Sequence, residues 1–201
     1  MLVKASGITN LTDARYFAAR EVHFLGFNLE EGTEGFIDPV FMKAIREWVE
    51  GPKIVGEFDR TPAGAVREAA EFYGLNAVQV TLAQELAPLE GLDVILHVPG
   101  AAAPALLRPL LQARAPWVSW FLIDFSHLDN AGAQLLAQAP VWSALFADFP
   151  ALLALDAPAA ALPELLTALH PAGLALRGGA EERVGVKSFE EIDAVFEELG
   201  R

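Results

Sequence analysis

The chain has 201 residues, which is at the small end for a single closed α/β barrel. Its formal net charge of −13 disfavours nucleic acid and anionic membrane surfaces as partners, since both are bound through clustered Lys and Arg side chains. It has no cysteine, which excludes disulfides and thiolate metal sites, and no apolar run approaches the roughly 20 residues that span a bilayer. We therefore expect a soluble cytoplasmic protein. The sequence has no metal-ligand cluster, P-loop or dinucleotide fingerprint, so neither a metal nor a cofactor is expected.

Apolar, strand-like runs alternate with helical segments along the whole chain. Most of these runs are near-continuous Val, Ile, Leu, Phe and Ala, which is typical of parallel strands covered on both faces. The predicted strands are Leu2–Ile8, Val22–Leu29, Lys53–Asp59, Ala77–Thr81, Asp93–Val98, Val118–Phe125, Ala151–Asp156 and Gly173–Arg177.

Capping signals mark several of the helices between these strands. Asn10 or Thr12 caps the first, Asp38 and Pro39 open the second, and Gly74 closes the third. The predicted helices are Asp13–Glu21, Val40–Val49, Ala63–Tyr73, Ala102–Ala113, Ala131–Gln138, Leu162–His170 and Ser188–Leu199.

The alternation predicts an α/β fold. Eight βα units in 201 residues favour a compact TIM (β/α)₈ barrel over an open doubly wound sheet. No linker or break in composition divides residues 1–201, so we expect one domain.

The run KASGIT at residues 4–9 resembles the opening motif of the phosphoribosylanthranilate isomerases, tryptophan-pathway enzymes built on a small TIM barrel. Strands 5 and 7 resemble the family weakly. Further stretches that resemble the family are residues 7–14, 25–27, 36–39, 55–56, 58, 75–80, 122–124, 179, 181, 185–187 and 196.

The resemblance implies an Amadori rearrangement, which converts an anthranilate-bearing phosphoribosyl group from an aldose to a ketose. In the family a cysteine thiolate removes the proton at sugar carbon 2, and an acid protonates the ring oxygen. Asp124 stands at the position of the acid, and Ser6 replaces the cysteine. A serine hydroxyl is a poor base without an activating neighbour, so the resemblance predicts weak or altered activity.

Other family positions also differ. Gly35 stands where the family has an arginine, and Thr81 followed by Leu82 replaces a histidine–glycine pair. In the phosphate site, Asp156 and the residues after it replace a glycine pair. After the last strand, Arg177, Gly178 and Gly179 keep the glycines of the family turn and add a cation, so half of a phosphate site is expected there.

Two histidines are alternative substitutes for the missing base: His97 at the end of the fifth predicted strand and His127 after the sixth. Gln79 is expected either to line the substrate pocket or to hydrogen-bond within the barrel, and Lys4 to form a structural ion pair. The other residues expected to line the substrate pocket are Thr81, His97 and Asp156.

Three hypotheses remain open. The chain is a weak isomerase of this family, an enzyme of altered specificity for a small phosphorylated or anionic molecule, or a non-catalytic barrel. The expected oligomeric state is a monomer or a homodimer.

Overall fold

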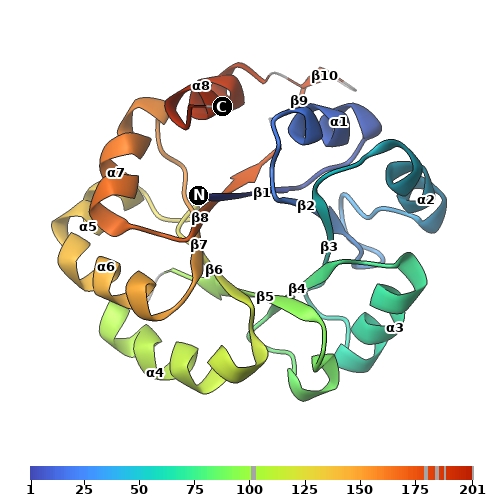
Figure 1. The fold of residues 1–201 in the computed structure, drawn as a ribbon, viewed down its shortest axis with the longest axis horizontal. Helices are drawn as coiled ribbons and strands as arrows, with labels where there is room; N and C mark the ends of the chain where they lie inside the picture. The colour runs from blue at the N-terminus through green and yellow to red at the C-terminus, as the bar shows by residue number, and fades with distance from the viewer. Residues whose placement is uncertain (101–102, 179–180, 184–185, 188, 201) are drawn as a thin grey trace.

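The chain folds into a closed barrel of eight parallel strands surrounded by helices, as predicted (Figure 1). The structure is a computed structural model that describes residues 1–100, 103–178, 181–183, 186–187 and 189–200. The strands are hydrogen-bonded in chain order, and β8 pairs with β1 to close the ring. At this closure Leu2 faces Gly173 and Ser6 faces Arg177.

All eight predicted strands are confirmed, with ends that differ by at most two residues. The barrel strands are β1 Leu2–Ser6, β2 Phe24–Asn28, β3 Lys53–Glu57, β4 Ala77–Thr81, β5 Asp93–Pro99, β6 Trp120–Asp124, β7 Ala151–Ala154 and β8 Gly173–Arg177. Two short strands, β9 Glu181–Arg183 and β10 Val186–Lys187, pair with each other outside the barrel.

The seven predicted helices are also found. Asn10 caps the first by accepting a hydrogen bond from the Asp13 N–H at 2.8 Å, and Asp38 caps the second. The predicted starts at Ala102 and Ser188 lie outside the described residues. The α-helices are α1 Leu11–Ala19, α2 Pro39–Trp48, α3 Ala63–Tyr73, α4 Pro104–Arg114, α5 Ala131–Ala137, α6 Ala139–Asp148, α7 Leu162–Leu169 and α8 Glu190–Glu198.

The prediction of eight full βα units is wrong at one strand. Only a 3₁₀ turn, η1 (Ala87–Leu89), follows β4, because the connection to β5 is short and ends at Gly91, which has a positive φ of 86°. Helix α6 was not predicted. Pro140 breaks the pattern after α5, yet proline is tolerated in the first turn of a new helix.

Two apolar layers hold the fold together. The outer layer packs the helices against the barrel and includes Phe17, Phe121 and Phe196, each at most 1% exposed. The inner layer fills the barrel with the inward-pointing side chains, which alternate along each strand with outward-pointing ones. Its buried members are Phe24, Val55, Ala77, Ile95, Leu122, Leu152, Ala154 and Ala175.

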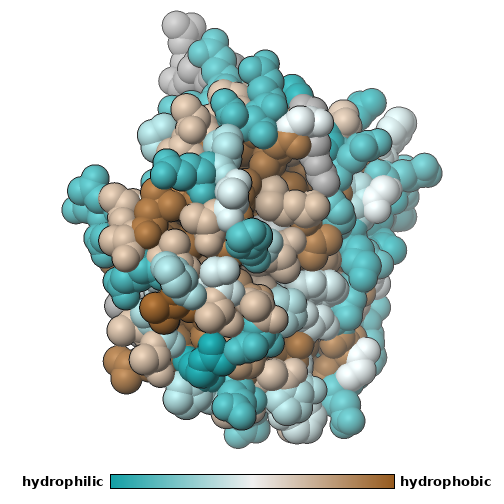
Figure 2. All heavy atoms as spheres, turned by 60° about the vertical axis from the view of Figure 1, so that its left-hand side comes forward, coloured by the Kyte–Doolittle hydropathy of each residue, from teal (hydrophilic) through white to brown (hydrophobic). Residues whose placement is uncertain are grey.

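The outer surface carries a mixture of residue types. On the face turned forward in Figure 2, hydrophobic residues lie scattered among hydrophilic ones. Within the described residues, no helix has both the length and the apolar character that crossing a membrane requires.

The barrel closure leaves no room for a side chain at Gly173. A Cβ atom there would lie 2.5 Å from the Leu2 carbonyl oxygen and 2.7 Å from Leu152 Cδ2. We expect Gly173→Ala to lower the free energy of unfolding in urea by about 1–3 kcal/mol or more, because the backbone of β1 has to move.

Gly64 provides the matched control. It lies in α3, where a Cβ added to it would have no atom within 4 Å, so Gly64→Ala should raise the free energy of unfolding by about 0.5–1 kcal/mol. Equal stability of Gly173→Ala and the wild type would contradict the tight closure.

Candidate active site

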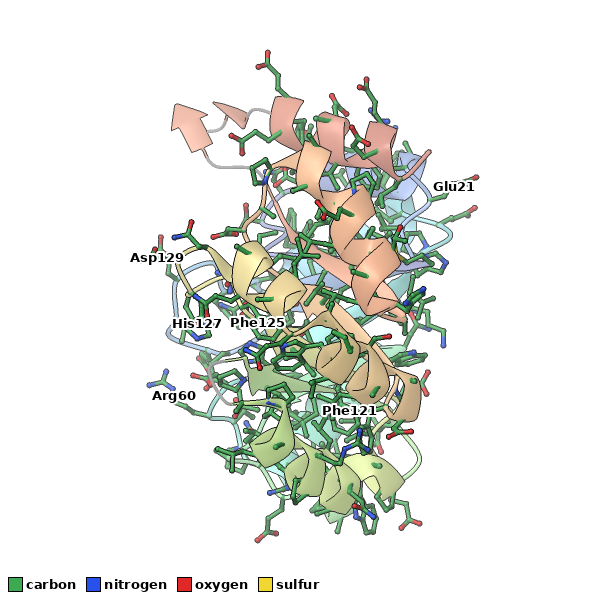
Figure 3. All side chains as sticks on the ribbon, turned by 90° about the vertical axis from the view of Figure 1, so that its left-hand side faces the viewer. Glu21, Arg60, Phe121, Phe125, His127 and Asp129 are labelled. Carbon is green, nitrogen blue, oxygen red and sulfur yellow. The ribbon has the colours of Figure 1, made fainter. Side chains whose placement is uncertain are left out.

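A cavity of about 550 Å³ opens at the C-terminal ends of the barrel strands. This is the end of a TIM barrel where active sites lie. In Figure 3, Arg60, His127 and Asp129 lie at this end and Glu21 at the opposite one. Polar residues that line the cavity are Ser6, Thr9, Asn28, Glu30, Thr33, Glu34, Glu57, Asp59, Gln79, Thr81, His97, Asp124 and Arg177.

Asp124, at the end of β6, lies at the centre of a hydrogen-bond network. Its Oδ2 is 3.0 Å from His97 Nε2 and 3.4 Å from an Arg177 guanidinium nitrogen. Its Oδ1 accepts hydrogen bonds from the Ser126 N–H at 2.9 Å and the Ser126 hydroxyl at 2.6 Å. The side chain is only 8% exposed, so the carboxylate depends on these donors in place of water.

These donors set the protonation state of Asp124. Burial alone would raise the pKa of Asp124, but hydrogen bonds from His97 and Ser126 outweigh burial and hold the pKa well below its ordinary range. The carboxyl is therefore ionised at neutral pH. Since an ionised carboxylate only accepts hydrogen bonds, His97 supplies the N–H that joins the two residues.

Ser6, at the end of β1, takes part in a second network. Lys4 Nζ donates to Ser6 Oγ and forms an ion pair with Glu57 Oε1. Lys4 is fully buried, whereas the Glu57 side chain is 16% exposed and lines the cavity. The expected ion pair of Lys4 is confirmed, and its partner is a carboxylate at the mouth.

The two predicted pocket residues on β4 both line the cavity but differ in their contacts. The buried Gln79 Oε1 has no hydrogen-bond partner among the described residues, so it can accept a hydrogen bond from a ligand hydroxyl or amine. Thr81 Oγ1 lies 2.6 Å from Gln84 Oε1 and 3.2 Å from the Asp59 carbonyl oxygen. Thr81 therefore anchors the loops after β3 and β4.

The residues expected to bind phosphate are only partly grouped. Arg177 and Gly178 line the cavity, but the Gly178 N–H donates to the Ser6 carbonyl at 2.9 Å. Gly179 lies outside the described residues. Asp156 is exposed in an adjoining hollow of about 610 Å³ that shares Arg177 with the main cavity.

The described lining of the main cavity is acidic. Arg177 is the single Lys or Arg among these lining residues, and it contacts Asp124. This lining alone gives little local attraction for an anion. Its carboxylates come from Glu30, Glu34, Glu57, Asp59 and Asp124.

The two histidines take different positions. His97 lines the cavity and contacts Asp124, whereas His127 is exposed and is absent from the described lining. The structure thus brings His97 together with Ser6, Asp124 and Arg177, and leaves His127 at the rim.

Two glutamates of the mouth were not predicted. Glu57 stands in an otherwise apolar strand run, two positions after Val55, and a charged residue there could have indicated a side chain at the site. Glu30 accepts hydrogen bonds from the N–H groups of Asp59, Arg60 and Thr61. Burial would raise the pKa of Glu30, but these hydrogen bonds lower it, and the loop after β3 is organised around the carboxylate.

Across the described part of the chain, His, Asp and Glu side chains form no group of three or more that could hold a metal ion.

The network around Asp124 predicts a pH-dependent contribution to stability. Because the folded-state pKa is lowered, this contribution is fully present above the unfolded-state pKa of about 4 and is lost as the pH falls through the folded-state value. We expect Asp124→Asn to lower the free energy of unfolding by about 1–3 kcal/mol at pH 7, and by less at pH 3.

Urea unfolding at pH 7, 5 and 3 measures this difference. The control is Asp129→Asn, at an exposed position, with an expected change within about 0.5 kcal/mol at each pH. A deficit in Asp124→Asn that stays constant down to pH 3 would show that the lowered pKa contributes nothing.

Comparisons with curated proteins and with solved structures both find phosphoribosylanthranilate isomerases among the similar proteins. No family model matches the sequence. A curated relative, N-(5'-phosphoribosyl)anthranilate isomerase of Maridesulfovibrio salexigens, is 25% identical over 206 residues, covering 100% of this chain and 99% of the relative. The phosphoribosyl anthranilate isomerase structure from Thermus thermophilus is 29% identical with a TM-score of 0.76, covering 100% of this chain and 98% of that one.

A third similar protein carries a ligand. It is a phosphoribosyl anthranilate isomerase in complex with reduced 1-(o-carboxyphenylamino)-1-deoxyribulose 5-phosphate. Its TM-score is 0.77 at 19% identity, with 100% of this chain and 98% of that chain covered, and this likeness concerns the fold.

Proposed function

The chain is a member of the phosphoribosylanthranilate isomerase family, and we propose that it catalyses the family's aldose–ketose isomerisation at its barrel mouth, at a reduced rate. The observation that carries the proposal is the His97–Asp124 pair. It joins an ionised carboxylate to an imidazole N–H inside a cavity large enough for a small sugar phosphate.

This pair supports the acid half of the reaction. In the reacting form His97 carries a proton on both ring nitrogens: Nε2–H stays bonded to Asp124, and the Nδ1 proton goes to the ring oxygen. The bond from sugar carbon 1 to that oxygen then breaks and its electron pair stays on oxygen. The lone pair of the amino nitrogen then forms a carbon–nitrogen double bond. Asp124 orients His97 by accepting the Nε2–H hydrogen bond, so the carboxylate at the family's acid position acts through the histidine.

The reduced rate follows from the rest of the mouth. Ser6 stands in place of the thiolate, and its hydroxyl accepts a hydrogen bond from Lys4. Among the described residues that line the cavity, Arg177 is the single Lys or Arg that a phosphate group could contact, and it also contacts Asp124. Weaker phosphate binding lowers the remote binding energy that contributes to catalysis.

A second candidate function is a barrel that binds a small phosphorylated or anionic ligand without turnover. The free Gln79 Oε1 favours ligand binding of some kind. The acidic lining of the cavity counts against this candidate, because it disfavours tight binding of an anion.

Turnover by the purified chain tests the proposal directly. We expect N-(5'-phosphoribosyl)anthranilate to be converted to the ketose with a measurable kcat and a KM above the micromolar range, because the phosphate has few cationic partners. Chromatographic detection of the product measures this conversion. Tight binding without product would favour the second candidate function. The absence of both binding and turnover would refute the two candidate functions.

The histidines provide a matched pair of variants. We expect His97→Gln to lower kcat by about 10²- to 10⁴-fold, because the proton donor is lost. His127→Gln, at the exposed rim, should keep the wild-type kcat. The reverse order of effects would assign the acid to His127.

A further inference from the structure

We propose that Glu57 is the general base of this site, held in place by Lys4, and that it performs the step a cysteine performs in the family. The assignment rests on the proposed isomerase function. Glu57 is not among the residues that resemble the family, since it interrupts the similar residues 55–56 and 58 of the third strand.

The position of Glu57 fits a base. It ends β3, faces Asn28 on β2 and Gln79 on β4 in the strand register, and lines the same cavity as His97. One oxygen, Oε1, is paired with Lys4. The other oxygen, Oε2, accepts no hydrogen bond from the described residues and belongs to a side chain exposed at the cavity, so it is available to a substrate C–H group.

The chemistry favours Glu57 over Ser6. A carboxylate accepts a proton directly, whereas a serine hydroxyl has to lose its own proton first. Lys4 is a hydrogen-bond donor to Ser6 and cannot serve as the acceptor for that proton while it is charged. A glutamate base paired with a histidine donor is a workable arrangement for an aldose–ketose isomerisation in a TIM barrel.

The barrel interior is built to hold the pair. Lys4 is fully buried, and a buried ion pair contributes little net stability. Gly26 on β2, between β1 and β3, makes room for it. A Cβ at Gly26 would lie 2.0 Å from Glu57 Oε1 and 2.7 Å from Lys4 Nζ. Burial of the Lys4–Glu57 pair costs desolvation energy, and the pair fits only because residue 26 is glycine. Its position at the cavity points to a functional role.

Atoms and electrons balance in the proposed step. Glu57 takes the proton from sugar carbon 2, the electron pair of that C–H bond forms a double bond between carbons 1 and 2, and the nitrogen regains its lone pair. Glu57 then returns the proton to carbon 1. The hydroxyl at carbon 2 loses its proton as the ketone forms, and this proton restores the one that His97 gave to the ring oxygen.

The test compares kcat for N-(5'-phosphoribosyl)anthranilate in the wild type, Glu57→Gln and Ser6→Ala. We expect Glu57→Gln to lower kcat by about 10²- to 10⁴-fold, and Ser6→Ala to retain a kcat at least about tenfold above that of Glu57→Gln. The control Glu47→Gln makes the same change on the exposed face of α2 and should keep the wild-type kcat.

A second variant addresses folding, because Glu57→Gln leaves Lys4 buried without its partner. The double variant Lys4→Met with Glu57→Gln removes both charges and should fold. We expect it to be inactive yet to bind reduced 1-(o-carboxyphenylamino)-1-deoxyribulose 5-phosphate within about threefold of the wild-type Kd, as a variant that has lost only its base would.

The outcomes separate the two proposals. Turnover by the wild type that survives in both Glu57 variants overturns the assignment of Glu57 and leaves the isomerase function standing. Loss of analogue binding together with kcat in the double variant also overturns the assignment, because Glu57 would then act in binding. Absence of turnover by the wild type overturns the isomerase function and the base together.

Discussion

The pairing of β8 with β1 is the constraint on which the rest of the structure depends. It closes the ring, brings the two ends of the chain's strand order together, and sets Ser6 directly beside Arg177. The Gly178 N–H then donates to the Ser6 carbonyl, so the loop after β8 begins beside the end of β1. Without this closure the polar side chains at the ends of β1, β3, β5 and β6 would not line one cavity.

Inside that space the charges are arranged as two separate networks. One joins His97, Asp124 and Arg177 on the side of β5, β6 and β8, and the other joins Lys4, Ser6 and Glu57 on the side of β1 and β3. Each network contains a carboxylate whose burial is offset by a cation or by hydrogen-bond donors. The mouth can therefore be acidic in composition and still keep two carboxylates in fixed positions, one hydrogen-bonded to His97 and one partly exposed at the cavity.

The fold was predictable from the sequence because buried parallel strands are apolar almost without interruption, as in β6 and β7. The motif around Ser6 and the end of β6 likewise drew attention to two residues, Ser6 and Asp124, that line the same cavity. The pairing of Lys4 with Glu57 could not be predicted. The two residues are 53 positions apart and meet only because Gly26 on the strand between them has no side chain. The ionised state of Asp124 also depends on three-dimensional contacts, above all those with His97 and Ser126.

Gly26 has a consequence for engineering this protein. Replacing glycine by alanine in regular structure is a common route to greater stability, and a strand glycine with ordinary dihedral angles is an obvious target for it. At this position the added methyl group would occupy the volume of the Glu57 carboxylate and the Lys4 ammonium. The Glu57 and Lys4 side chains would then have to move, which changes the lining of the cavity. Libraries designed to stabilise this chain should therefore keep residue 26 as glycine.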